Sequence, residues 1–170
     1  MKYQVRYNTD SALNLTQLLI YLLDNKEVTY ESFIEVSTIT SSTFYKLINT
    51  LKDMIDDLNM KIVLSKTSYL NTEIDTNQLK TNKYFLTTLG EDKYHYEIDN
   101  LDDNLLIKYS MPIVYLMLKQ HKYIKYEKLS NIFPNLRRDT LITLIKKLQS
   151  ILLDEITKNE INSYVLINEL

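Results

Sequence analysis

The chain has 170 residues, of which 45% are apolar and 25% are charged, and its formal net charge is −2. These proportions are typical of a soluble globular protein with one domain or two small ones. The longest apolar run, "MPIVYLML", is much shorter than the roughly 20 residues of a membrane-spanning helix, and the opening "MKYQVRYNTD" lacks the apolar segment of a secretory signal. The absence of cysteine excludes disulfides and thiolate chemistry. We therefore expect a cytoplasmic protein without a membrane span.

The charge is unevenly distributed along the chain. Residues 1–104 carry a net charge of −6, residues 105–150 a net charge of +7, and residues 151–170 a net charge of −3. A basic segment within an acidic chain is one form that a nucleic-acid footprint takes. The alternative is a Lys-rich pair of helices with a solvated polar face. An AT-rich genome encodes abundant Lys, Asn, Ile and Tyr. This bias does not explain the adjacent arginines Arg137 and Arg138, which are therefore stronger evidence for a nucleic-acid surface than the lysines are.

The first 71 residues predict three helices and a strand. Leucines recur at helical spacing over residues 13–25, and a turn then leads to a second helix of about eight residues, which Thr29 can cap. A long third helix follows the turn "TIT" with Ser41 or Ser42 as its N-cap, and residues 61–71 are β-prone. The apolar stripe of the third helix consists of Phe44, Leu47, Ile48, Leu51, Met54, Ile55 and Leu58.

A connecting region follows. Residues 83–98 contain two runs rich in Tyr, Phe and Thr around the only glycine, Gly90, and we predict a β-hairpin there. Residues 99–104, "DNLDDN", are polar and predict a boundary between two parts of the chain.

The second half repeats the first at an offset of 96 residues, which becomes 97 after an insertion near Pro134. A helix is predicted over residues 105–121, a second helix from Lys125, a third helix after the turn "FPN", and a β-prone piece at 162–167. The apolar stripe of this third helix consists of Leu141, Leu144, Ile145, Leu148, Ile151 and Leu152.

Three helices, a tight turn before the third and a strand pair after it are the order of a winged helix-turn-helix. Both halves have this order. We therefore predict a mainly α protein with small β-hairpins, of the α+β class, with two winged helix-turn-helix modules in tandem. The first module covers residues 1–82, a hairpin and linker cover 83–104, and the second module covers 105–170.

The predicted third helices carry a family resemblance. "TITSSTFYKLINTLKDMI" is similar to the recognition-helix pattern of bacterial winged helix-turn-helix transcription regulators, especially the Mga-like and DeoR-like groups. "NLRRDTLITLIKKL" resembles a looser relative of the same pattern. The resemblance implies a sequence-specific DNA-binding regulator from a bacterium, a phage or a plasmid. The tandem architecture also resembles ScpB-like protein-interaction subunits and plasmid or phage replication initiators, which remain alternatives.

In a helix-turn-helix, the first half of the third helix enters the major groove of DNA, and flanking basic groups hold phosphates. Arginine grips guanine or phosphate with a planar fork, so Arg137 and Arg138 are the main candidates, unless they pair with an acidic surface of the first half. The candidate DNA-binding residues are Arg137, Arg138, Thr143, Lys146, Lys147, Lys125 and Lys128 in the second half, and Ser41, Ser42, Tyr45, Lys46, Asn49 and Lys66 in the first.

Catalysis has little support in the sequence. The two histidines, His95 and His121, stand far apart, and a lone Gly90 cannot build a phosphate-binding loop. We expect no enzyme activity, no catalytic residues, no metal and no cofactor. The expected partner is double-stranded DNA, and the sequence leaves open whether the chain also forms a homodimer or binds another protein.

Overall fold

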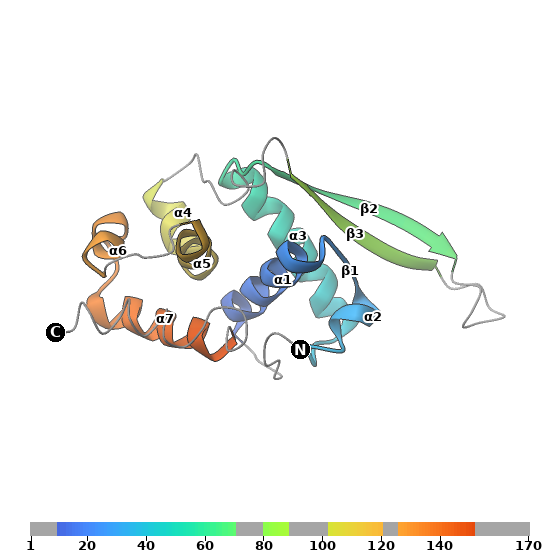
Figure 1. The fold of residues 1–170 in the computed structure, drawn as a ribbon, viewed down its shortest axis with the longest axis horizontal. Coiled ribbons are helices and arrows are strands. Elements are labelled where there is room, and N and C mark those ends of the chain that lie inside the picture. Colours follow the sequence, from blue (N-terminus) through green and yellow to red (C-terminus); the bar gives the residue numbers. More distant parts are fainter. Residues whose placement is uncertain (1–9, 71–79, 89–101, 121–125, 152–170) are drawn as a thin grey trace.

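The computed structural model describes residues 10–70, 80–88, 102–120 and 126–151. These residues form a mainly helical protein with one small antiparallel sheet (Figure 1). The elements in chain order are α1 (Ser11–Asn25), β1 (Glu27–Thr29), α2 (Tyr30–Phe33), α3 (Ser41–Asp57), β2 (Ile62–Leu70), β3 (Lys80–Thr88), α4 (Asp103–Lys108), α5 (Ser110–Gln120), α6 (Tyr126–Ile132) and α7 (Arg138–Ile151).

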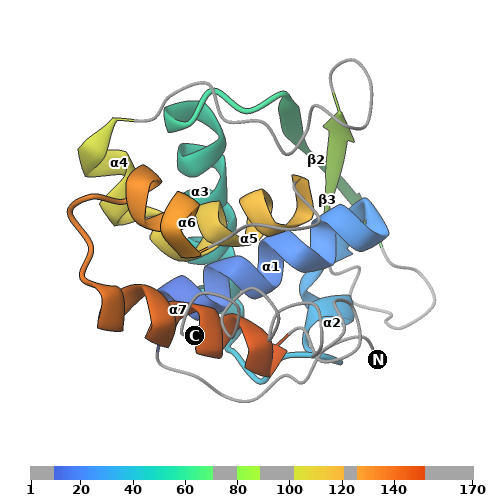
Figure 2. The same ribbon diagram turned by 60° about the vertical axis from the view of Figure 1, so that its left-hand side comes forward.

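Helix α1 lies at the centre of the molecule. It packs against α3 on the side of the first half and against α5 and α7 on the side of the second half (Figures 1 and 2). Because helices cover it on several sides, every residue from Leu13 to Ile20 is buried, including the polar Asn14, Thr16 and Gln17. One continuous hydrophobic core therefore joins the two halves.

Helix α2 begins with the predicted cap. The Thr29 side chain accepts a hydrogen bond from the Ser32 amide at 3.0 Å, and the Ser32 hydroxyl accepts one from the Thr29 amide at 3.0 Å. This reciprocal capping box confirms Thr29 as the N-cap. The helix has four residues rather than the predicted eight, because the Val36 amide bonds to the Phe33 carbonyl and tightens the chain into a turn.

Helix α3 has the predicted apolar stripe, and all seven of its residues are buried. The predicted N-cap was wrong by one or two positions. The cap is Thr40, whose backbone is extended and whose hydroxyl accepts a hydrogen bond from the Thr43 amide at 3.3 Å. Ser41 and Ser42 already belong to the helix, so neither has the extended backbone that an N-cap needs.

The sheet has the strand order β1-β3-β2, with both pairs antiparallel. All nine residues of β2 pair with β3, from Ile62 opposite Thr88 to Leu70 opposite Lys80. The resulting hairpin projects from the helices as a wing (Figure 1). On β3, Tyr84 and Leu86 alternate with more exposed neighbours and point into the core.

Residues 83–88 were expected to begin a hairpin around Gly90, which would either extend the first wing or bridge the modules. They belong to β3, which pairs with β2 along its whole length and with β1 over residues 83–85. The predicted boundary at residue 82 consequently falls inside β3. The rest of that predicted hairpin, residues 89–98, lies outside the described residues.

The second half begins with two helices where one was predicted over residues 105–121. The break between α4 and α5 falls at Tyr109. Pro112 explains it, because proline has no amide hydrogen to donate to the carbonyl of Lys108 and its ring would clash with that carbonyl.

Helices α6 and α7 follow, and the stripe residues of α7 up to Ile151 are buried as predicted. The β-prone piece at residues 61–71 is largely β2, which spans Ile62–Leu70. Its counterpart at 162–167, the predicted Leu152 position and the start of the second helix at Lys125 lie outside the described residues.

Candidate nucleic-acid interface

The exposed face of α3 is polar over its first half, from Ser41 to Asn49. Ser41, Ser42, Lys46 and Asn49 are all exposed, because they lie opposite the stripe that packs into the core. This part of the helix carries one positive charge and no negative charge. It offers hydroxyl, amide and ammonium groups, which are the side-chain types that contact base edges and phosphates.

The acidic residues of α3 lie nearer its other end. Asp53 and Asp56 are exposed, and Asp57 accepts a hydrogen bond from the Tyr109 hydroxyl at 2.7 Å. Carboxylates repel phosphate, so they leave the first half of α3 as the surface suited to nucleic acid.

An aromatic corner joins α3 to the wing. The half-buried ring of Tyr45 lies 6.4 Å from that of Tyr84 on β3, and the Lys52 ammonium lies 5.7 Å from the centre of the Tyr84 ring. Burial, followed by the neighbouring Tyr45, raises the pKa of Tyr84 above its usual value. Tyr45 thus has a packing role, whatever else it contacts. Lys52 lies off the apolar stripe, and its position two turns after Tyr45 places it on the same flank of α3.

The wing carries the remaining candidate of the first half. Lys66 is exposed on β2, together with its neighbours Ser65, Thr67 and Ser68. The Ser68 hydroxyl bonds to the Asn82 side chain across the two strands at 2.7 Å. The stretch of β2 from Ser65 to Ser68 is therefore polar and accessible.

The basic candidates of the second half gather around α7. Arg137 immediately precedes this helix and Arg138 is its first residue, and both are exposed. Thr143 and Lys146 are exposed further along the same helix, and Lys128 is exposed on α6. Lys125 lies outside the described residues.

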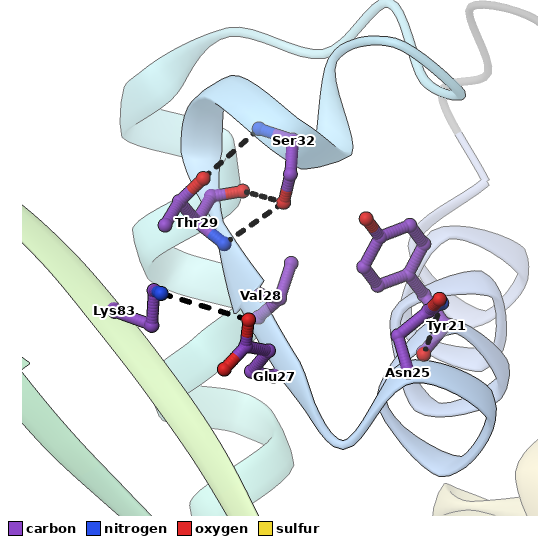
Figure 3. A pocket seen from close by; sticks show the side chains of 7 residues that line it. All are labelled: Tyr21, Asn25, Glu27, Val28, Thr29, Ser32 and Lys83. Carbon is purple, nitrogen blue, oxygen red and sulfur yellow. Dashed lines mark hydrogen bonds and ion pairs between the residues drawn. The ribbon is translucent and has the colours of Figure 1, made fainter.

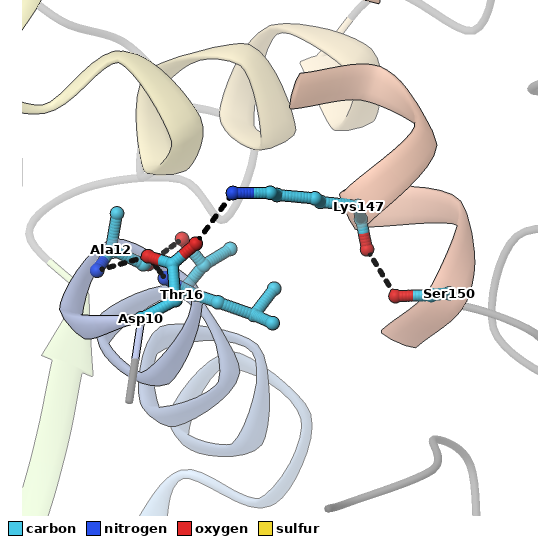
Figure 4. A network of polar contacts seen from close by, with 6 residues as sticks. Asp10, Ala12, Thr16, Lys147 and Ser150 are labelled. Atoms are coloured by element: carbon cyan, nitrogen blue, oxygen red, sulfur yellow. Dashed lines mark hydrogen bonds and ion pairs between the residues drawn. The ribbon is translucent and has the colours of Figure 1, made fainter. Parts of the chain in front are cut away.

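Lys147 has a contact that the sequence did not predict. Its ammonium lies 2.7 Å from a carboxylate oxygen of Asp10, the N-cap of α1 (Figure 4). The other oxygen of Asp10 accepts hydrogen bonds from the amides of Ala12 at 3.1 Å and Leu13 at 3.2 Å. Partial burial raises the pKa of Asp10, but the bonds from Lys147 and from the two amides outweigh it and hold that pKa below its usual value. A charged contact therefore joins α7 to the start of α1.

One hollow borders the contact between Asp10 and Lys147, and another lies beside the sheet. A cavity of about 400 Å³ between α1, α5 and α7 is lined by Asp10, Thr143 and Lys147, among others. A second hollow of about 350 Å³ lies between α1, β1, α2 and β3 (Figure 3). There the Tyr21 ring faces α2, and the Lys83 ammonium lies 3.5 Å from the Glu27 carboxylate. In the described ranges, no group of three or more His, Asp or Glu side chains is suitably placed to hold a metal ion.

The comparison with known families concerns the first half. Residues 7–75 match the Mga helix-turn-helix domain. This part of the chain is an Mga helix-turn-helix domain. The match confirms the Mga resemblance, and its described residues run from α1 through β2, so α3 and its exposed polar face belong to the Mga domain.

The Mga domain indicates a DNA-binding transcription regulator, and domains of this kind are typical of regulators that are not enzymes. No curated protein and no solved structure matches the chain. None of the helices in the described part of the chain is long and apolar enough to span a membrane.

Proposed function

We propose that the chain is a sequence-specific transcription regulator of a bacterium, a phage or a plasmid, and that it binds duplex DNA through two winged helix-turn-helix modules. The Mga helix-turn-helix domain at residues 7–75 carries the proposal. The polar first half of α3 supports it, because the residues exposed there have the chemistry of a groove-reading helix.

In the first module, α3 reads the major groove and the wing holds the backbone. Asn49 has the paired donor and acceptor that recognise adenine, and Lys46 donates to guanine or to phosphate. Ser41 and Ser42 donate to phosphates or bases at the start of the helix. Lys66 on the wing contacts the backbone, and Lys52, held over the Tyr84 ring, lies on the same side as the wing.

The element order supports a second module. Helices α5, α6 and α7 follow one another as α1, α2 and α3 do, at the offset of the sequence repeat. In this module, which we assign to residues 105–170, Arg137 and Arg138 lead the reading helix. Its DNA surface is completed by Lys125, by Lys128 on α6, and by Thr143, Lys146 and Lys147 on α7. The first module then extends through β3, and the linker follows that strand.

The test begins with selection of duplexes from a random library, followed by titration of the enriched site and a scrambled duplex. Lys46→Ala with Asn49→Ala, and Arg137→Ala with Arg138→Ala, should each weaken binding to the enriched site by about 1–3 kcal/mol for each side chain that reads a base. Lys108→Ala is the control, because it removes an exposed helical lysine from α4, outside the proposed surface.

The dependence on salt separates base reading from phosphate binding. Each phosphate that the protein neutralises contributes about −0.9 to the slope of log K against log salt, so replacing Lys66 or Lys146 with alanine should flatten that slope and weaken binding to both duplexes alike. If the wild-type chain binds no duplex at about 50 mM salt, the DNA-binding proposal is wrong and a protein-interaction role of the ScpB-like kind gains weight.

A further inference from the structure

The contact between Lys147 and Asp10 brings a basic residue of the proposed DNA surface against a fixed carboxylate. The two residues are 137 positions apart in the chain. The carboxylate is held by α1, since its second oxygen is occupied by the amides of Ala12 and Leu13. Figure 4 shows the Lys147 side chain extending from α7 toward the beginning of α1. Asp10, which belongs to the first half of the chain, thus holds the Lys147 ammonium on the side of α7 that faces the start of α1.

The ion pair is accessible to solvent. The Lys147 side chain is 47% exposed and that of Asp10 is 27% exposed. Exposed pairs of this kind shift an equilibrium by up to about five-fold, so a phosphate can displace Asp10 from Lys147. A phosphate that approaches Lys147 must also come near the Asp10 carboxylate, which repels it. Both effects weaken the contact between Lys147 and a phosphate, and this contact does not depend on the DNA sequence.

We propose that Asp10 is a specificity-determining residue, which holds Lys147 away from the DNA backbone and thereby lowers sequence-independent binding. The inference rests on the proposed DNA-binding function of α7. With Lys147 restrained, binding depends more on the bases that Arg137 and Arg138 read at the other end of the helix. Asp10 belongs to the Mga domain, so a residue of this domain weakens phosphate binding by the second half.

The decisive variant is Asp10→Asn, which removes the charge and keeps an oxygen that can cap α1, because asparagine caps helices about as well as aspartate. It should bind a scrambled duplex up to about five-fold more tightly than the wild type. Its slope of log K against log salt should be steeper by about 0.9, for one additional neutralised phosphate. The ratio of specific to scrambled binding should fall.

Two controls isolate the mechanism. The double variant Asp10→Asn with Lys147→Gln should bind the scrambled duplex no more tightly than the wild type, because the tighter binding requires the released ammonium. Asp102→Asn removes the same charge from the N-cap of α4 and should leave the salt slope unchanged. Asp10→Ser, which also retains a capping oxygen, repeats the test if thermal melts show that Asp10→Asn is poorly folded.

The outcomes separate this inference from the proposed function. A wild-type chain that binds DNA while Asp10→Asn and Asp10→Ser bind the scrambled duplex no more tightly would overturn the role of Asp10 alone. Tighter binding that persists in the double variant would also overturn it, since the effect would then come from the loss of the Asp10 carboxylate itself and not from a released Lys147 ammonium. If the wild-type chain binds no duplex, both the DNA-binding proposal and the role of Asp10 are wrong.

Discussion

Replacing Tyr109 with phenylalanine tests how the two halves are held together. Tyr109 lies between α4 and α5, is only 2% exposed, and donates a hydrogen bond to Asp57 at the end of α3 at 2.7 Å. The substitution removes the hydroxyl group and keeps the ring that fills the core. Any decrease in stability can therefore be assigned to the hydrogen bond rather than to a cavity.

The expected decrease follows from the nature of the acceptor. A hydrogen bond to a charged group contributes about 1.5–3 kcal/mol to stability, so Tyr109→Phe should lower the free energy of unfolding by that amount at neutral pH. For a chain of this size, each kcal/mol lowers the melting temperature by about 2–4 °C. The assay is urea unfolding followed by circular dichroism, with thermal melts alongside. Tyr21→Phe is the control, because it removes a hydroxyl that makes no hydrogen bond within the described residues from a half-buried ring.

Alkaline pH gives the same experiment a second readout. Burial, the hydrogen bond to Asp57, and the charges of Asp57 and Asp53 raise the pKa of Tyr109 well above its usual value of 10.0. The unfolded chain loses this proton near pH 10 while the folded chain retains it, so the contribution is complete below pH 10 and is lost as the pH rises through the folded pKa. Between pH 9 and 11, wild-type stability should fall more steeply than that of Tyr109→Phe. Equal stability of the two chains at pH 7, with parallel pH profiles, would refute the assigned hydrogen bond.

Three further substitutions test the local structure by urea unfolding. Leu22→Ala should cost about 2–5 kcal/mol, because Leu22 is completely buried on the central helix; a cost below about 1 kcal/mol would contradict the packing of α1. Thr29→Ala should cost about 1 kcal/mol because it removes the cap, while Thr29→Ser should cost little. Lys26→Gly should stabilise by up to about 1 kcal/mol, because Lys26 has the left-handed φ of 66° that glycine tolerates better; destabilisation would argue against that conformation.

Local features of the fold could be predicted from the sequence because they depend on neighbouring residues. The spacing of apolar residues identified α1, α3 and α7, and the α3 stripe is buried at every predicted position. The cap at Thr29 also depends on residues only three positions apart. The break before α5 was missed, although Pro112 was a visible signal in the sequence.

Pairing between distant residues could not be predicted in the same way. The composition of residues 83–88 indicates a strand, but it does not show that this strand pairs with β2, which lies earlier in the chain. For the same reason, the sequence showed that Lys147 lies off the apolar stripe without showing that Asp10 stands opposite it. Exposure follows from helical periodicity, whereas the partner of an exposed charge depends on how separate helices pack.

The central position of α1 connects these observations. A helix that packs against one neighbour needs one apolar face, but the burial of Asn14, Thr16 and Gln17 means that α1 is covered on its polar side as well. The covering helices α5 and α7 lie beyond the matched range of the Mga domain. The start of α1 supplies the carboxylate that holds Lys147, and the end of α3 accepts the bond from Tyr109. Within the described residues, the Mga domain and the second half share one hydrophobic core, and the contacts at Asp10 and Asp57 also join them, so packing fixes the orientation of α7 relative to α3.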